Sequence, residues 1–261
     1  MSKVIIMGSG AAPGVPSLSK GFGSCNPNNP KNVRLRSGTY MELGDVKFII
    51  DTSPDLRTQL INHNIRFLDA VFYTHVHADH LHGIDDLREI NRIEGKTLDI
   101  FASANNMDYI RLRFDYLIAQ NNTEINPVYR AALYPNVFEY EKSFEFKNLK
   151  VTPILLDGHN VEVSGYIFND GEVVHIADFH QITENSLKLI KRQPEVLIMP
   201  LTTPNGTKFH AGFEDIMYYT RLINPKRMII THMASECDYD AIKSQCPANV
   251  EPAYDGLTIG W

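Results

Sequence analysis

The stretch Thr74-His75-Val76-His77-Ala78-Asp79-His80 is the part of the chain around which the rest is organised. It places four side chains that can bind metal within six residues, and it follows an apolar run that predicts a short buried strand. If the segment is extended, His75 and His77 point the same way because side chains alternate with period two, and Asp79 and His80 come one turn later. One short segment can therefore provide two ligands to each of two neighbouring metal ions.

Three further candidate ligands lie where predicted strands end. His159 lies in a turn between two strands, Asp178 follows the strand 173–177, and His232 follows the strand 228–231. A histidine-rich surface turn is the alternative interpretation of the cluster, and it is disfavoured because these ligands follow at plausible intervals. Imidazole and carboxylate suit Zn²⁺, Mn²⁺ or Fe²⁺, and the cluster contains no thiolate that would favour one of these ions.

The pattern His75-Val-His77-Ala-Asp79-His80 resembles the HxHxDH signature of the metallo-β-lactamase fold superfamily of hydrolases, and the order of the later candidates is similar to the same family. Two further runs, Gly8–Pro16 and Gly83–Arg88, resemble one branch of that family. This branch contains the phosphoribosyl cyclic phosphodiesterase of phosphonate breakdown and is related to the tRNA 3′-processing nucleases. The resemblance spans nearly the whole chain and implies an α/β fold, a four-layer αββα sandwich of two mixed β-sheets.

The resemblance also implies cofactors and roles for individual residues. Two divalent ions would be the cofactors, Mn²⁺ or Zn²⁺ with Fe²⁺ as a further candidate, and Asp79 is expected to be catalytic as well as a ligand. Asp51 is expected to accept hydrogen bonds that orient the 74–80 stretch, although it could instead cap the next helix. The implied ligands are His75, His77 and His159 for the first metal, Asp79, His80 and His232 for the second, and Asp178 as the bridge between them.

His210 stands in a loop before a predicted helix, at a position where the branch carries a histidine that assists catalysis near the leaving group. Histidine titrates near neutrality, so it can donate a proton at working pH. An ordinary loop histidine is the alternative. Of the remaining histidines, His63 and His175 are expected to be structural, whereas His82 and His180 are left open between a structural role and a place beside the cleft.

The reaction implied by the resemblance is hydrolysis of a small cyclic phosphate, of phosphoribosyl or nucleotide type, by a hydroxide that bridges the two metals. Lys31, Arg34 and Arg36 follow the first loop and could bind the phosphate of this small phosphodiester substrate, or form a solvated strand edge. A tRNA 3′-processing nuclease and a hydrolase of thioester- or lactam-type bonds remain alternatives, because fold alone does not decide between these chemistries. A non-catalytic binding module is disfavoured, since the ligand set is intact.

The composition is typical of a soluble globular protein, with 43% hydrophobic and 21% charged residues among 261. A net charge of −6 gives no support for polyanion binding, so nucleic acid is not an expected partner. No apolar run is long enough for a transmembrane helix, no signal peptide is recognised, and the three cysteines fit a reducing compartment. We therefore expect a cytoplasmic protein without a membrane partner, and we leave a homodimer open.

Strands and crossing helices alternate in the pattern, which predicts two mixed sheets packed face to face with helices outside, in one domain spanning 1–261. The polar, irregular segment 120–134 is either an insertion over the site or a surface excursion. The expected strands are 4–7, 39–43, 46–50, 68–73, 98–102, 137–146, 151–156, 163–168, 173–177, 196–199, 228–231 and 257–260, and the expected helices are 55–62, 85–92, 105–119, 186–192, 213–223 and 238–245.

One departure from the branch concerns a structural zinc site. Relatives carry a cysteine-rich site after the first loop, completed by a histidine shortly after the last metal-binding histidine. This chain keeps Cys25 alone, and Ser235 stands three residues after His232. A single thiol cannot form the tetrahedral site that structural zinc requires. We therefore predict that this zinc site is absent and that other contacts hold the loop 17–33.

Overall fold

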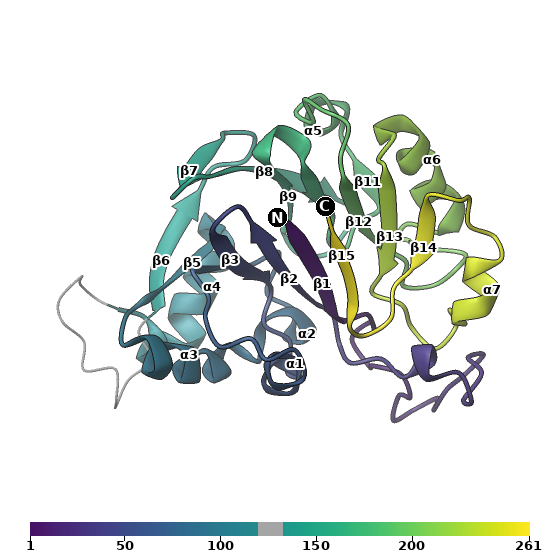
Figure 1. Cartoon of the computed structure of the whole chain (residues 1–261), viewed down its shortest axis with the longest axis horizontal. Coiled ribbons are helices and arrows are strands. Elements are labelled where there is room, and N and C mark those ends of the chain that lie inside the picture. Colours follow the sequence, from purple (N-terminus) through teal and green to yellow (C-terminus); the bar gives the residue numbers. More distant parts are fainter. Residues whose placement is uncertain (120–132) are drawn as a thin grey trace.

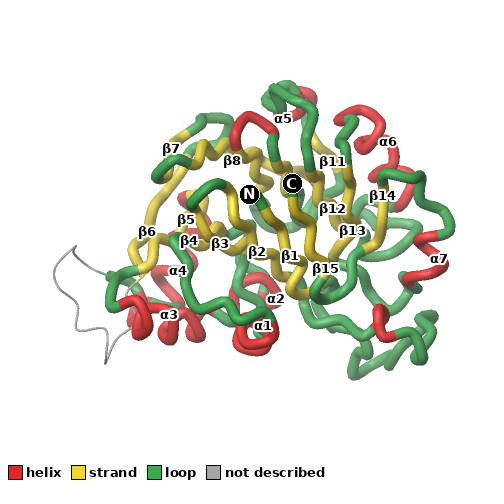
Figure 2. Tube along the Cα trace, in the orientation of Figure 1, coloured by secondary structure: helices red, strands yellow, loops and turns green. Residues whose placement is uncertain are grey.

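Two β-sheets pack face to face in the computed structural model, which describes residues 1–119 and 133–261 (Figure 1). Helices cover the outer face of each sheet, so the layers follow the order helix, sheet, sheet, helix (Figure 2). Each sheet combines antiparallel and parallel strand pairs. The predicted αββα sandwich of two mixed sheets is therefore confirmed.

The first sheet is formed by the N-terminal half of the chain together with the last strand. In spatial order it contains β15 (Leu257–Gly260), β1 (Lys3–Gly8), β2 (Gly38–Leu43), β3 (Val46–Ile50), β4 (Ala70–Phe72), β5 (Leu98–Ser103) and β6 (Leu133–Phe138). β2 and β3 form the predicted hairpin, in which Gly44 has φ +60°, a conformation that glycine adopts without strain. The helices that pack on its outer face are α1 (Leu56–Asn62), α2 (Ala78–Leu81), α3 (Leu87–Glu94) and α4 (Ala104–Arg113).

The second sheet is formed by the C-terminal half of the chain. In spatial order it contains β11 (Gln181–Ile182), β8 (Leu149–Asp157), β9 (Val163–Phe168), β10 (Val173–His175), β12 (Val196–Pro200), β13 (Arg227–Thr231) and β14 (Val250–Pro252), with β7 (Phe144–Phe146) paired to β8. Its outer face is covered by α5 (Glu184–Leu187), α6 (Phe213–Ile223) and α7 (Tyr239–Lys243). Short 3₁₀ turns lie at Pro30–Asn32, Ile84–Asp86, Asp115–Leu117 and Asn169–Gly171.

Several predicted elements differ in extent from the observed ones. The helix expected over 105–119 ends at Arg113, because Phe114 leaves the helical conformation with φ −129° and packs with the 3₁₀ turn against the outer core. The helix expected over 186–192 is instead the shorter α5, Glu184–Leu187, which begins where the side chain of Thr183 accepts a backbone hydrogen bond and caps it. Local capping contacts therefore set these boundaries, whereas the strand and helix types were mostly predicted.

The strand expected over 137–146 is divided into β6 and β7. Glu141 has φ +62° in the turn between them, a conformation that a continuous strand cannot contain. The short strands β11 and β14 were not predicted. The question about the segment 120–134 falls largely outside the described residues, and its last two residues belong to β6. No helix within the described residues combines the length and the apolar character needed to cross a membrane.

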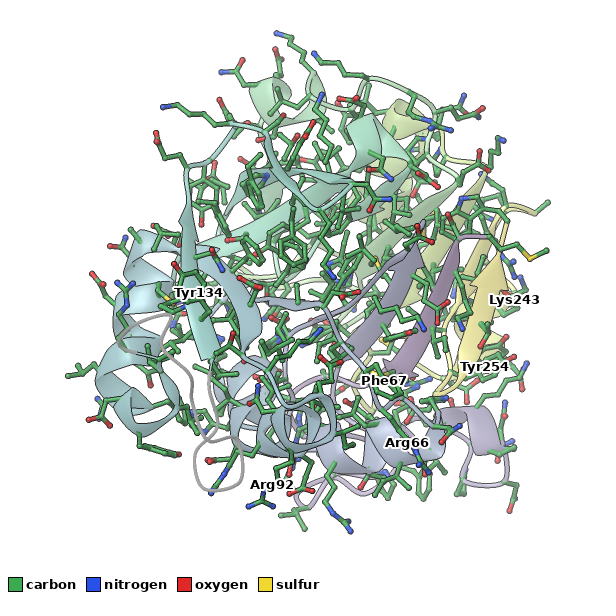
Figure 3. The ribbon with its side chains drawn as sticks, turned by 60° about the vertical axis from the view of Figure 1, so that its left-hand side comes forward. Arg66, Phe67, Arg92, Tyr134, Lys243 and Tyr254 are labelled. Carbon is green, nitrogen blue, oxygen red and sulfur yellow. The ribbon has the colours of Figure 1, made fainter. Side chains whose placement is uncertain are left out.

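The core between the two sheets is centred on the ring of Phe72 in β4. This side chain is fully buried, and the space between the sheets is filled with side chains (Figure 3). Ring centroids of Phe101 and Phe48 lie 4.8 and 5.2 Å from that of Phe72 on the first sheet. Those of Tyr166 and Phe168 lie 5.5 and 5.7 Å away on the second sheet. Aromatic packing therefore joins the two sheets directly.

One edge of the sandwich collects the carboxyl ends of several strands. β3 and β4 run parallel in the first sheet, as do β10, β12 and β13 in the second, and ligand sites form where such strands end. β8 has the same direction as β10, because both pair antiparallel with β9. The residues that follow these strands are Asp51 after β3, His75 after β4, His159 after β8, Asp178 after β10 and His232 after β13.

Replacing Phe72 by alanine removes the ring at the centre of this core. We expect the free energy of unfolding to fall by about 3–5 kcal/mol, because the transfer energy is lost and a cavity remains. Equilibrium unfolding in urea measures the change. Phe67→Ala is the matched control, since Phe67 is 54% exposed in the loop before β4 (Figure 3) and its loss should change the free energy by less than about 0.5 kcal/mol. Equal effects of the two substitutions would contradict the prediction.

Candidate metal centre

The seven side chains proposed as metal ligands meet at this edge of the sandwich. They come from four separate parts of the chain, and three groups of them have potential ligand atoms within 4.8 Å of one another. The buried members are His75, Asp79, His80, Asp178 and His232, while His77 and His159 are partly exposed. The sequence therefore identified residues that the fold brings together, although they are up to 157 positions apart (232 − 75).

Three histidine nitrogens form the first group. His77 Nδ1 lies 3.2 Å from His75 Nε2 and 3.1 Å from His159 Nε2. The backbone places the first two rings on one side of the extended segment before α2, as side-chain alternation predicted. Nitrogen atoms this close with their lone pairs converging can be bridged by a cation, and imidazole is a common ligand of zinc and similar metals.

The second group contains two histidines and a carboxylate. His80 Nε2 and His232 Nε2 lie 3.3 Å apart, and Asp79 Oδ2 lies 3.3 Å from each of them. Asp79 and His80 lie on the first turn of α2, whereas His232 follows β13 with φ +55°. A non-glycine residue in this left-handed conformation is uncommon, and such residues cluster at functional sites.

Asp178 lies beside both groups. Its Oδ2 is 3.9 Å from His80 Nε2, and it forms a third group of potential ligands with His75 and His80. Its Oδ1 lies 3.4 Å from His232 Nδ1 but is buried without a hydrogen-bond partner in the described part of the protein. A buried carboxylate that lacks its full set of partners is unfavourable unless a cation compensates it. The donor atoms and this carboxylate thus fit a pair of divalent metal ions.

Hydrogen bonds on the far side of the rings fix which nitrogen carries the proton. The hydroxyl of Thr74 donates to Asp51, so it can accept from His75 Nδ1 at 2.9 Å. His80 Nδ1 lies 2.7 Å from Asp51 Oδ2, which assigns the proton of this ring to Nδ1 as well. In both rings Nε2 is therefore the nitrogen that faces the metal site, and a bound cation would take the place of any proton on it.

Burial and charge set the ionisation of these groups. Burial raises the pKa of Asp79, but hydrogen bonds from His232 and His80 outweigh it and hold this pKa well below its usual range. Burial of Asp178 is likewise outweighed by the charges of His232 and His80, which lower its pKa. Burial lowers the pKa of His75, and the charge of His80 lowers it further. The two carboxylates are therefore ionised and His75 is neutral at pH 7, as metal ligands must be.

The carboxylate of Asp51 contacts both Thr74 and His80 in the 74–80 stretch. Its Oδ1 accepts the backbone N–H of Thr74 and its Oδ2 accepts the Thr74 hydroxyl, both at 2.7 Å, in addition to His80 Nδ1. The alternative, that Asp51 caps the next helix, does not fit, because the residue before α1 is Asp55. Asp51 is thus placed to orient the 74–80 stretch through these three contacts.

A cavity of about 330 Å³ lies against the ligands. His210 is on its wall, with its ring centroid 5.1 Å from that of His159 and 6.4 Å from that of His232. Its Nδ1 is buried and has no hydrogen-bond partner among the described residues, and burial lowers the pKa of the ring. The other walls are formed by 11–14, Ser17, Ser19, Lys20, Thr202, Thr203 and 234–236.

The structure contradicts the expected role of Arg34 in binding phosphate. Arg34 is 2% exposed, and its Nη2 donates to Asn32 Oδ1 at 2.9 Å and to the carbonyl oxygen of Cys237 at 2.8 Å. It thereby joins the loop 17–33 to the segment that follows His232. These contacts hold the loop, while the absence of a structural zinc site stays a prediction. Sequence reasoning failed here because side-chain direction in an irregular loop follows no period.

Arg36 and Lys31 are also engaged by the protein and are not among the described residues that line the cavity. Arg36 pairs with Asp55 (Nη1–Oδ1 3.1 Å), and its Nε donates to the carbonyl oxygen of Ala12 at 3.2 Å. Lys31 Nζ lies 4.2 Å from the ring centroid of Tyr239. The expectation that Arg36 grips a phosphate is therefore not supported by its position.

Sequence reasoning missed three residues at the site. Thr74 was quoted with the cluster, but its hydrogen bonds to Asp51 and to the ring of His75 were not predicted. Thr202 Oγ1 lies 3.2 Å from His232 Nδ1, a contact between residues 30 positions apart that no motif signals. Lys20 lines the cavity and pairs with Glu236 at 2.5 Å.

Asp51→Asn tests the support of the cluster. Asparagine keeps the shape but carries no charge and replaces one accepting oxygen with a donor, so the rings of His75 and His80 lose their fixed orientation. We expect the affinity for Zn²⁺ or Mn²⁺ to fall by about 10- to 100-fold, measured by competition with a chromophoric chelator. Asp45→Asn, in the exposed turn between β2 and β3, is the matched control. Unchanged affinity in Asp51→Asn would show that its contacts do not orient the ligands.

The family of the chain follows from comparison with known proteins. A family model described as the beta-lactamase superfamily domain matches residues 47–233, which is more than half of the chain and includes all seven proposed ligands. Among curated proteins, an octanoyltransferase of Porphyromonas gingivalis is 26% identical over 257 residues. That alignment covers 98% of this chain but 51% of the other protein, so this chain spans about half of its length. A ribonuclease Z of Listeria monocytogenes is 22% identical over 295 residues, covering 90% of this chain and 95% of that protein.

Solved structures support the same fold. A crystal structure of a diphosphatase from the PhnP family has a TM-score of 0.87 at 24% identity, covering 100% of this chain and 98% of that one. The short form of human tRNase Z has a TM-score of 0.70 at 16% identity, covering 99% and 98%. Both the family model and the arrangement of the sheets thus lead to one assignment: this chain belongs to the β-lactamase superfamily and has the metallo-β-lactamase fold.

Proposed function

We propose that the chain is a two-metal phosphodiesterase that cleaves small cyclic phosphates of phosphoribosyl or nucleotide type. The observation that carries the proposal is the cluster of seven ligands, five of which line a cavity of about 330 Å³ that also has His210 on its wall. A volume of this size is typical of sites for small molecules. A phosphodiester is an electrophile that two adjacent cations stabilise well during displacement at phosphorus.

The residues of the chain divide the work of such a reaction. When bound, two divalent ions supply charge to the phosphoryl oxygens and lower the pKa of water, so that a nucleophile exists at neutral pH. His75, His77 and His159 would hold one ion, Asp79, His80 and His232 the other, and Asp178 would contact both. Asp79 is catalytic in this proposal only through the ion that it holds.

His210 would protonate the departing alkoxide. It is the one histidine outside the proposed ligand set among the described residues that line the cavity. The Thr207 hydroxyl accepts its backbone N–H at 3.1 Å, and the Thr207 N–H donates to its carbonyl oxygen at 2.8 Å, so the loop is held in place. Burial lowers the pKa of His210, and the negative charge of a phosphate in the cavity would favour the protonated ring.

An RNA 3′-processing nuclease is the second candidate. It is favoured by the ribonuclease Z relative, which this chain matches over 95% of that protein's length. A net charge of −6 favours the small-molecule reaction, because RNA binding usually requires a basic surface. The octanoyltransferase relative is about twice as long as this chain, so its name alone favours no activity for the matched half. A thioester is nevertheless an informative substrate for testing the third alternative.

A substrate panel separates these candidates. The protein is stripped with a chelator, which should abolish activity, and is then reloaded with Mn²⁺, Zn²⁺ or Fe²⁺. Hydrolysis of bis(p-nitrophenyl) phosphate, 2′,3′-cyclic nucleotides, a ribose cyclic phosphate, an acyl thioester and a tRNA precursor is measured side by side. We expect the cyclic phosphates to have the highest kcat/KM. Preferred cleavage of the tRNA precursor or of the thioester would overturn the proposal.

His210→Ala tests the proton donor through the leaving group. Hydrolysis of a cyclic nucleotide releases an alkoxide, which is a poor leaving group and needs a proton donor. Its turnover should therefore fall by about 100- to 10,000-fold. Turnover of bis(p-nitrophenyl) phosphate should fall far less, because p-nitrophenolate leaves without a proton. Bound metal should be unchanged. His82→Ala is the matched control, since His82 is exposed beside Phe114. Equal losses on both substrates, or loss of metal, would contradict this role.

A further inference from the structure

A small polar chamber lies between the two sheets directly behind the metal centre. Its volume is about 10 Å³, and its lining includes the proposed ligands His80, Asp178 and His232. The same lining includes His175 and Thr231, which take no part in the mechanism described above. The chamber and the substrate cavity share Asp178 and His232, whereas His175 and Thr231 line the chamber alone.

Strand alternation explains why polar groups face the chamber. In β10, Val173 faces the core between the sheets and Val174 faces the outer core, so His175 points inward again. In β13, Ile229 faces the inner core and Ile230 the outer one, so Thr231 also points inward. The apolar filling of the sandwich therefore ends in a layer of polar side chains next to the ligands.

Three polar atoms on residues of this lining have no hydrogen-bond partner in the described part of the protein. They are His175 Nδ1, Thr231 Oγ1 and Asp178 Oδ1, and all three are buried. Buried polar atoms are nearly always satisfied, by protein or by an ordered water. Burial lowers the pKa of His175 to about 3, so the ring is neutral and offers one donor and one acceptor.

We propose that the chamber binds one ordered water molecule, which positions the carboxylate of Asp178. The water accepts a hydrogen bond from the Thr231 hydroxyl and donates to His175 Nδ1 and to Asp178 Oδ1. Three partners are the usual number for a buried water, and a volume of about 10 Å³ holds one such molecule. With Oδ1 held by the water and by its 3.4 Å contact with His232 Nδ1, Oδ2 stays directed at His80 Nε2, which lies 3.9 Å away.

Thr231 and His175 are thus positioning residues for the metal centre. The binding of the water itself does not depend on the substrate, whereas its effect on metal affinity rests on the proposed metal ligands. Thr231→Val removes the hydroxyl but keeps the branched shape of the side chain, so it separates the effect of the hydroxyl from the effect of packing. A serine at the same position restores the hydroxyl and serves as the conservative rescue.

High-resolution crystal structures of the metal-loaded wild type, Thr231→Val and Thr231→Ser test the water directly. We expect density for one water within hydrogen-bond distance of all three atoms in the wild type and in Thr231→Ser, and none at that place in Thr231→Val. A dry chamber in the wild type would overturn the proposal, as would a monovalent cation there. This result does not depend on which substrate the enzyme cleaves, so the water proposal and the proposed function can fail independently of each other.

Metal binding tests the positioning role. Thr231→Val should weaken metal affinity by about 10-fold in chelator competition and change the visible spectrum of the Co²⁺-loaded protein, and Thr231→Ser should restore both. Thr220→Val is the matched control, because Thr220 is also buried, in α6, and its hydroxyl donates to the carbonyl of Ile216 in its own helix, away from the metal centre. Unchanged affinity and spectrum in Thr231→Val, with its fold intact by urea unfolding, would rule out the positioning role.

Discussion

The hydrogen bonds that Thr74 donates to Asp51 are the contact on which the metal centre depends. They join the ends of two parallel strands, with the backbone N–H and the hydroxyl of Thr74 each 2.7 Å from a carboxylate oxygen. Asp51 has φ +62°, a conformation with an energetic cost that persists only where surrounding contacts impose it. Because His80 bonds to the same carboxylate, both ends of the 74–80 stretch are fixed, and its four ligands divide between two metal positions.

Charge balance is the second constraint, since three carboxylates are buried at one edge of the sheets. Burial lowers the pKa of His80, but the charges of Asp51 and Asp79 outweigh this effect and raise it well above its usual value. The site therefore attracts positive charge strongly, and divalent ions can supply it where protons otherwise would. Burying three carboxylates close together is unfavourable by itself, and bound metal ions would compensate this cost.

Much of the fold and of the candidate site could be predicted, because it depends on residues that are close together in the sequence. The 74–80 stretch contains its ligands at adjacent positions, and strand endings placed Asp178 and His232 at a common sheet edge. Other features depend on contacts between distant residues, which no period in the sequence reveals. Arg34 resembles a surface arginine in sequence but is buried by its bonds to Asn32 and to the Cys237 carbonyl, 203 positions further on. The contact of Thr202 with the ring of His232 was missed for the same reason.

Substrate choice cannot come from the metal centre alone, because proteins with names as different as a diphosphatase and a tRNase Z share this fold. It must come from the cavity walls, which consist of loops and not of strands. One wall joins the loop 17–33 to residues 234–236, and the buried guanidinium of Arg34 holds these two segments together. The ion pair of Lys20 with Glu236 spans the same junction at the surface. Because buried Arg34 holds the two loop segments together, the exposed side chains of these loops can differ between relatives and change substrate specificity. The metal ligands keep their positions, because they follow the strands of the two sheets.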